Sequence, residues 1–134
     1  MSEKPSRDVH LPYPLPCTSI VYRMVPADTD WIADDGTPDP AMFYRMANDR
    51  DGVSVATTLK AGLERLTRRG IQGARSLHVG RVRQIDNLNV RSKGPEKTHA
   101  AITGLPYSDD DVGKAERLAD KLLEISRTVP LPTS

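Results

Sequence analysis

The stretch "EKTHAAITGLPYSDDDVGKAERLADKLLEIS" (96–126) decides the fold class, because it joins a strand directly to a helix. Its short apolar run, "HAAITG" (99–104), predicts a strand that ends at Gly-Leu-Pro. A helix is expected over 109–128, with Ser108 as N-cap and three aspartates complementing the positive end of its dipole. Its buried stripe is expected to comprise Val112, Ala115, Leu118, Ala119, Leu122 and Ile125.

Further strands and helices are expected upstream of this unit. Apolar runs predict strands at 19–25, 53–58, 74–85 and 87–90, with a bulge or turn at Gly80. Helices are expected at 40–47, capped by Asp39, and at 59–70, capped by Thr58 and closed by Gly70. The alternation predicts an α+β fold, a small mixed or antiparallel sheet with about three helices.

The 134 residues are enough for one domain. We expect a proline-rich N-terminal arm over 1–18 and a single α+β domain over 19–134. The single cysteine, Cys17, excludes an internal disulfide and a multi-cysteine metal site. The polar N-terminus shows no signal peptide, and no apolar run reaches the roughly 18 residues of a membrane span. A cytoplasmic protein with no membrane association is therefore expected.

Charge is distributed unevenly along the chain, although the formal net charge is only +1. Residues 27–51 are acidic and residues 60–97 are basic. This asymmetry fits two segments or two subunits of a homo-oligomer that pack together, and it also fits a nucleic-acid surface. The basic segment contains no aromatic residue for base stacking. Nucleic-acid binding stays an alternative, with the candidate residues Arg65, Arg68, Arg69, Arg81 and Arg83.

Two residues are candidates for catalysis. His99, at the mouth of its strand, suits general acid–base work, but it equally suits a hydrogen bond that fixes a loop. Ser54 is a candidate nucleophile, although it lies outside a G-x-S-x-G motif. His78 would meet His99 if their two strands paired. The chain has no Walker motif, no G-x-G-x-x-G and no metal-ligand spacing, so neither a cofactor nor a metal is expected.

Arg23 lies between two valines on the first expected strand. We expect this strand to lie near a sheet edge, with the Arg23 guanidinium reaching solvent.

Four stretches together resemble a group of small uncharacterised prokaryotic proteins: "VYRMVP" (21–26), "PAMF" (40–43), "DGVSV" (51–55) and "HAAITGLP" (99–106). The resemblance spans roughly residues 20–128. It implies a prokaryotic origin and no particular activity.

An arginine on the first strand, followed by a strand carrying serine and then a helix, resembles NAD-using ADP-ribosyltransferase and RES-type toxin domains. That resemblance implies that Arg23 binds the dinucleotide and that Ser54 lines its pocket. The glutamate that such transferases place on a late strand has no counterpart in "HAAITG", which offers His99 instead.

Because no complete catalytic set is visible in the sequence, the leading hypothesis is a non-enzymatic accessory or regulatory protein that acts through contacts with a protein partner. The NAD-using transferase or toxin is the alternative, and nucleic-acid binding through residues 60–97 is the second alternative.

Overall fold

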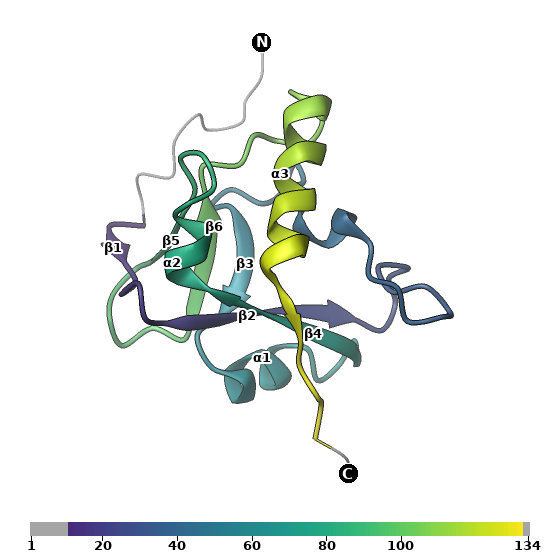
Figure 1. The fold of residues 1–134 in the computed structure, drawn as a ribbon. Helices are drawn as coiled ribbons and strands as arrows, with labels where there is room; N and C mark the ends of the chain where they lie inside the picture. The colour runs from purple at the N-terminus through teal and green to yellow at the C-terminus, as the bar shows by residue number, and fades with distance from the viewer. Residues whose placement is uncertain (1–10, 133–134) are drawn as a thin grey trace.

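A seven-stranded sheet, antiparallel throughout, forms the middle of the molecule in the computed structural model, which describes residues 11–132 (Figure 1). The strands are β1 (Tyr13–Pro14), β2 (Ile20–Pro26), β3 (Val53–Ala56), β4 (Ile71–His78), β5 (Asn89–Ser92), β6 (His99–Thr103) and β7 (Arg127–Thr128). The helices are η1, a 3₁₀ turn (Pro40–Phe43), α1 (Leu59–Arg65), α2 (Val79–Val82) and α3 (Val112–Ile125). The predicted α+β class is confirmed, and the helix expected over 40–47 is the short 3₁₀ turn η1.

The strands lie in the order β1-β5-β6-β3-β2-β4-β7. Figure 1 shows α1 and α3 on opposite sides of β2 and β4. Side chains alternate along β2 accordingly. Val21 and Val25 belong to the core cluster that includes Leu118 and Leu122 of α3. Met24 lies on the α1 side, where a Cβ added to Gly62 would come within 2.5 Å of its sulfur, so the glycine lets α1 lie close to the sheet.

Helix α3 carries the expected apolar stripe but begins later than expected. Its N-cap is Asp111, whose carboxylate accepts a hydrogen bond from the Lys114 amide at 3.1 Å, so the prediction of Ser108 as cap is wrong. Ser108 instead donates its main-chain N–H to the Arg45 carbonyl at 2.9 Å. Of the expected stripe, Ala115, Leu118, Ala119 and Leu122 are buried and Ile125 is partly buried against the core. Val112 is 58% exposed, so its inclusion in the buried stripe is wrong.

The strand expected over 74–85 ends at His78, and the chain continues as α2. Val79 and Val82 are both fully buried, which is the spacing of a helical turn rather than of a strand. His78 lies opposite Ile20 of β2. Since β4 pairs with β2 and β7 and not with β6, His78 does not meet His99.

Strand β2 lies inside the sheet, so the expectation of an edge strand is wrong. It pairs with β4 along its whole length, but its ladder with β3 has a single pair, Tyr22 opposite Ala56. The two strands therefore separate beyond this pair, next to Arg23.

The proline-rich stretch from Leu11 onward lies against the domain. Strand β1 pairs with β5, and Leu11 and Leu15 are buried. The rest of the expected N-terminal arm, residues 1–10, lies outside the described residues. Across residues 11–132, no helix combines the length and the apolar character that crossing a membrane requires.

Candidate functional site

A cavity of about 340 Å³ opens where β2 and β3 separate. Three strands contribute to its wall: β2 provides Arg23, β3 provides Ser54 and β6 provides His99. Helix α1 and the residues after it add Arg65 and Arg69. The strand order β6-β3-β2 thus brings together three residues that are far apart in the sequence.

The Arg23 guanidinium bridges the gap between the two strands. Its Nε donates to the Met42 carbonyl at 2.7 Å and its Nη1 to the Ser54 carbonyl at 3.0 Å. Its carbon Cζ lies 5.1 Å from the centre of the Trp31 ring, which also lines the cavity. Desolvation lowers the pKa of Arg23 to about 10, an effect that the nearby charge of Asp49 partly offsets. At neutral pH the group is therefore a desolvated cation held by carbonyls.

Ser54 and His99 form a hydrogen-bonded pair on the cavity wall. Ser54 Oγ lies 2.7 Å from His99 Nε2. The β3–β6 ladder sets Ser54 opposite Ala101 and His99 opposite Ala56, so the two side chains are diagonal neighbours on one face. Burial, reinforced by the charge of Arg65, lowers the pKa of His99, against the opposing effect of Asp51. The neutral imidazole that results can accept a proton.

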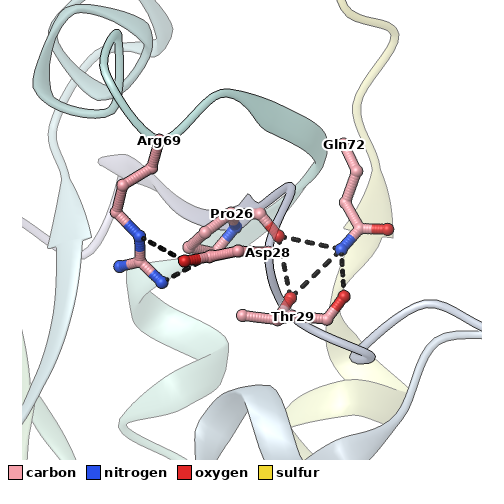
Figure 2. A network of polar contacts seen from close by, with 5 residues as sticks. All are labelled: Pro26, Asp28, Thr29, Arg69 and Gln72. Carbon is pink, nitrogen blue, oxygen red and sulfur yellow. Dashed lines mark hydrogen bonds and ion pairs between the residues drawn. The ribbon is translucent and has the colours of Figure 1, made fainter.

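Two exposed arginines add positive charge at the mouth of the cavity. Arg69 binds Asp28 through two contacts, Nη2 to Oδ1 at 2.7 Å and Nε to Oδ2 at 3.3 Å (Figure 2). The two side chains are 51% and 60% exposed, so this ion pair is worth little in free energy and can exchange partners. Arg65 is also exposed. Its charge is close enough to lower the pKa of His99.

The loop that carries Trp31 is fixed by Gln72 of β4. Figure 2 shows the Gln72 amide donating to the Pro26 carbonyl at 2.8 Å and to the Thr29 carbonyl at 2.8 Å. The Thr29 hydroxyl also donates to the Pro26 carbonyl at 2.8 Å. These contacts hold the start of the loop next to β4, whether or not Arg69 binds Asp28.

Arg45, which the sequence analysis did not single out, holds in place the loop whose Asp49 lines the cavity. It is 4% exposed and donates to the carbonyls of Asp49 at 2.9 Å and Arg50 at 2.6 Å. It also donates to the Leu105 carbonyl at 3.1 Å. Its Cζ lies 4.1 Å from the centre of the Tyr107 ring. The sequence offers one indication of this role, which is that Arg45 comes shortly before the turn-forming "NDRDG" (48–52).

A second cavity, of about 420 Å³, adjoins the first. The two share four lining residues, which are Asn48, Asp49, Ser54 and His99. The Ser54–His99 pair therefore lies on the wall between them. Lys93, which follows β5, and Asp51 line the second cavity and not the first.

The candidate nucleic-acid residues do not gather on one surface. Arg65 and Arg69 line the first cavity, and Arg68 does not. Arg83 lies beyond α2, where it donates to the Leu15 carbonyl, to Asn89 Oδ1 at 2.6 Å and to Cys17 Sγ at 3.0 Å. Arg81 is an exposed residue of α2. Among residues 11–132, no three His, Cys, Asp or Glu side chains are grouped so that they could hold a metal ion.

The cavity combines groups suited to two parts of one ligand. Guanidinium groups bind phosphate oxygens, and an aromatic ring stacks on a planar base. A serine hydroxyl paired with a neutral histidine can be deprotonated, or the histidine can take a proton from a bound hydroxyl. Comparisons with protein-family models, characterised proteins and solved structures gave no match, so this interpretation depends on the geometry of the site.

Proposed function

We propose that the first cavity binds a nucleotide of the NAD type and that the protein is an NAD-using transferase similar to ADP-ribosyltransferase and RES-type domains. The observation that carries the proposal is that Arg23, Ser54 and His99 line one cavity. The resemblance of the sequence to these domains implies a dinucleotide contact for Arg23 and a pocket position for Ser54, and such roles require the two residues to share a site.

Positive charge supports binding of the phosphates. Arg23 has carbonyl partners for two of its nitrogen atoms and no direct carboxylate contact among residues 11–132. Its desolvated positive charge is thus only partly compensated, which favours an anionic ligand. Arg65 and Arg69 add exposed guanidinium groups that can reach a second phosphate.

Aromatic and apolar side chains support binding of a base. Trp31 and Tyr22 line the cavity together with Met24, Leu66 and the half-exposed Met46. A purine ring can stack on an aromatic side chain, and each such stack is worth about 1–3 kcal/mol in single-stranded nucleic-acid complexes. The cavity volume of about 340 Å³ lies at the lower end of the range for small-molecule sites.

The Ser54–His99 pair supports a transfer step. In ADP-ribosyl transfer, the bond from ribose C1′ to the nicotinamide nitrogen breaks and neutral nicotinamide leaves. The oxygen of an acceptor hydroxyl forms the new bond to C1′, and the acceptor's proton passes to the neutral His99. This role replaces the glutamate that β6 lacks, and the lowered pKa of His99 keeps its imidazole in the neutral form that can accept a proton.

The hypothesis of a non-enzymatic protein that acts through a protein partner remains the alternative. It relied on the lack of a complete catalytic set in the sequence, and the convergence of Arg23, Ser54 and His99 weakens that reason. Nucleic-acid binding is less favoured, since the candidate arginines lie on separate parts of the molecule. A cytoplasmic location belongs to the proposal, because NAD is plentiful there.

A melting experiment with millimolar NAD tests the proposal. A ligand at 100 times its dissociation constant stabilises the folded state by about 2.7 kcal/mol, which raises the melting temperature of a domain of this size by several degrees. Arg65→Ala should reduce the rise, because Arg65 lines the cavity, and Arg68→Ala should not, because Arg68 does not line it. Both side chains are exposed, so neither change should unfold the protein. No rise in the unmodified protein would overturn the proposal.

A further inference from the structure

Two positive charges lie close together at the first cavity. Arg23 and Arg69 both line it. Desolvation, and to a smaller extent the charge of Arg69, lowers the pKa of Arg23, and the charge of Asp49 offsets part of this effect. Like charges that are near enough to shift a pKa repel each other, so a negative charge close to either arginine stabilises the empty cavity.

Asp28 supplies a negative charge to Arg69 from outside the cavity. Its carboxylate accepts hydrogen bonds from Arg69 Nη2 at 2.7 Å and from Nε at 3.3 Å (Figure 2). Asp28 is not one of the residues that line the cavity, whereas Arg69 is. A phosphate group binds a guanidinium in the same two-pronged way as a carboxylate. An anionic ligand in the cavity and the Asp28 carboxylate therefore need the same two nitrogen donors.

The turn that carries Asp28 keeps its shape without the ion pair. The Thr29 N–H closes the turn by donating to the Pro26 carbonyl at 3.3 Å. The Gln72 amide binds the carbonyls of both residues, as Figure 2 shows. The Arg69 side chain is 51% exposed, so it can leave the carboxylate and be hydrated or bind another anion. When the pair opens, the arginine is therefore the partner that moves, and the carboxylate stays beside it.

We infer that Asp28 is an internal competitor of the ligand: it holds Arg69 while the first cavity is empty and lowers the affinity of that cavity for anions. The inference rests on the binding of phosphates proposed for this cavity, and it adds a residue that sets how tightly they bind. In the empty protein, Asp28 offsets the repulsion between Arg69 and Arg23. When a phosphate group binds, Arg69 exchanges the carboxylate for the phosphate. The exchange costs little, because the pair that opens is exposed to water.

Calorimetric titration with inorganic pyrophosphate tests the competition, because this probe has neither a base nor a sugar. Asp28→Asn should bind pyrophosphate about two- to fivefold more tightly than the unmodified protein, which is the range expected when one exposed ion pair no longer has to open. Asp30→Asn is the matched control, since Asp30 lies on the same loop and has no arginine partner within residues 11–132. It removes the same charge and should strengthen binding less. Both aspartates are exposed, so neither change should unfold the protein.

The same two changes made together with Arg69→Ala separate competition from a general effect of charge. Arg23 and Arg65 still line the cavity of that variant. Without Arg69, Asp28→Asn should strengthen pyrophosphate binding no more than Asp30→Asn does.

The outcomes distinguish this inference from the proposed function. Equal gains for Asp28→Asn and Asp30→Asn in the protein that keeps Arg69 would overturn the competition and leave the anion site standing. Tighter pyrophosphate binding by Asp28→Asn, without any binding of NAD, would support the competition and overturn the NAD-using function alone. Binding of pyrophosphate by neither the unmodified protein nor Asp28→Asn would overturn both.

Discussion

Arg23 of β2 donates a hydrogen bond to the main-chain carbonyl of Ser54 on β3, at 3.0 Å, at the point where the two strands no longer pair. A side chain thus takes the place of a main-chain donor in the ladder. The same side chain donates to Met42 of η1. Arg23 therefore both closes the gap in the sheet and presents its charge to the cavity, which joins the stability of the fold to the proposed binding of anions.

Arg23→Lys should lower the free energy of unfolding by about 1–3 kcal/mol. Both side chains carry a positive charge, so the cost of desolvating a cation remains. A lysine ammonium cannot reproduce the planar arrangement by which Arg23 reaches the Met42 and Ser54 carbonyls. Urea denaturation followed by circular dichroism measures the difference. Equal stability of the two proteins would show that the two hydrogen bonds do not hold the strands.

His99 should titrate below its ordinary pKa of 6.5, because burial and then the charge of Arg65 disfavour its protonated form. NMR of the imidazole carbon-bound protons as a function of pH measures the midpoint. Arg65→Ala should raise that midpoint by removing a nearby cation, whereas Arg68→Ala serves as a control of equal charge change. A midpoint at or above 6.5 in the unmodified protein would contradict this account of the histidine.

The same lowered pKa gives a pH dependence of stability. Below 6.5 the unfolded chain protonates its histidine before the folded protein does, so proton binding favours unfolding. The contribution of neutral His99 to the free energy of unfolding is fully present above pH 6.5. It is lost as the pH falls through the lower pKa that His99 has in the folded state. The unfolding free energy of His99→Gln should fall less steeply with acid than that of the unmodified protein. If the unfolding free energies of the two proteins changed equally with pH, protonation of His99 would not be linked to stability.

Gly52→Ala should be destabilising by about 1–3 kcal/mol. Its backbone has a φ of 122°, and an added Cβ would lie 2.2 Å from the Ile102 carbonyl oxygen. Gly36 is the matched control, because its φ is 88° and nothing lies within 4 Å of its added Cβ. Gly36→Ala introduces backbone strain alone, whereas Gly52→Ala adds a steric clash. Thermal unfolding should therefore show a larger loss of stability for Gly52→Ala than for Gly36→Ala. A larger loss at Gly36 would contradict the close packing of the loop on β6.

Leu118→Ala and Leu122→Ala should each cost about 2–5 kcal/mol, since both side chains are fully buried in the core cluster. Val112→Ala, on the same helix, should change stability by less than about 0.5 kcal/mol, because Val112 is 58% exposed. Chemical denaturation of the three variants checks the difference. A cost at Val112 as large as at Leu118 would mean that the first turn of α3 is buried against another surface.

The elements that the sequence predicts well are those with local signals. Asp39 caps η1 and Thr58 caps α1, as expected from side chains that accept hydrogen bonds from nearby amides. The stripe of α3 follows from helical periodicity. The sequence does not identify the N-cap of α3, because four polar residues precede Val112 and each is a suitable cap. A long-range contact decides the position: the Ser108 N–H binds the Arg45 carbonyl, and Asp111 is the residue that caps the helix.

The site was only partly predictable, because it depends on which strands are neighbours. Arg23, Ser54 and His99 stand out individually in the sequence, but their convergence requires β3 to lie between β2 and β6. No local pattern encodes that order. The internal position of β2 was missed for the same reason, since a charged residue between two valines is typical of a strand that reaches solvent. Arg45 is not identified from the sequence because its partners, three main-chain carbonyls and the Tyr107 side chain, are brought to it by the fold, and its place before the turn-forming "NDRDG" is only a weak signal.

Fluorescence of Trp31 tests nucleotide binding in the first cavity most directly. Trp31 is the single tryptophan of the chain and lines that cavity, so a ligand that fills the cavity must change its surroundings. Titration with NAD, with excitation beyond the absorption of adenine, should give a saturable change in emission. Arg65→Ala should shift the midpoint to higher NAD concentration, and Arg68→Ala should leave it in place. Emission that stays constant up to millimolar NAD would contradict the proposed site.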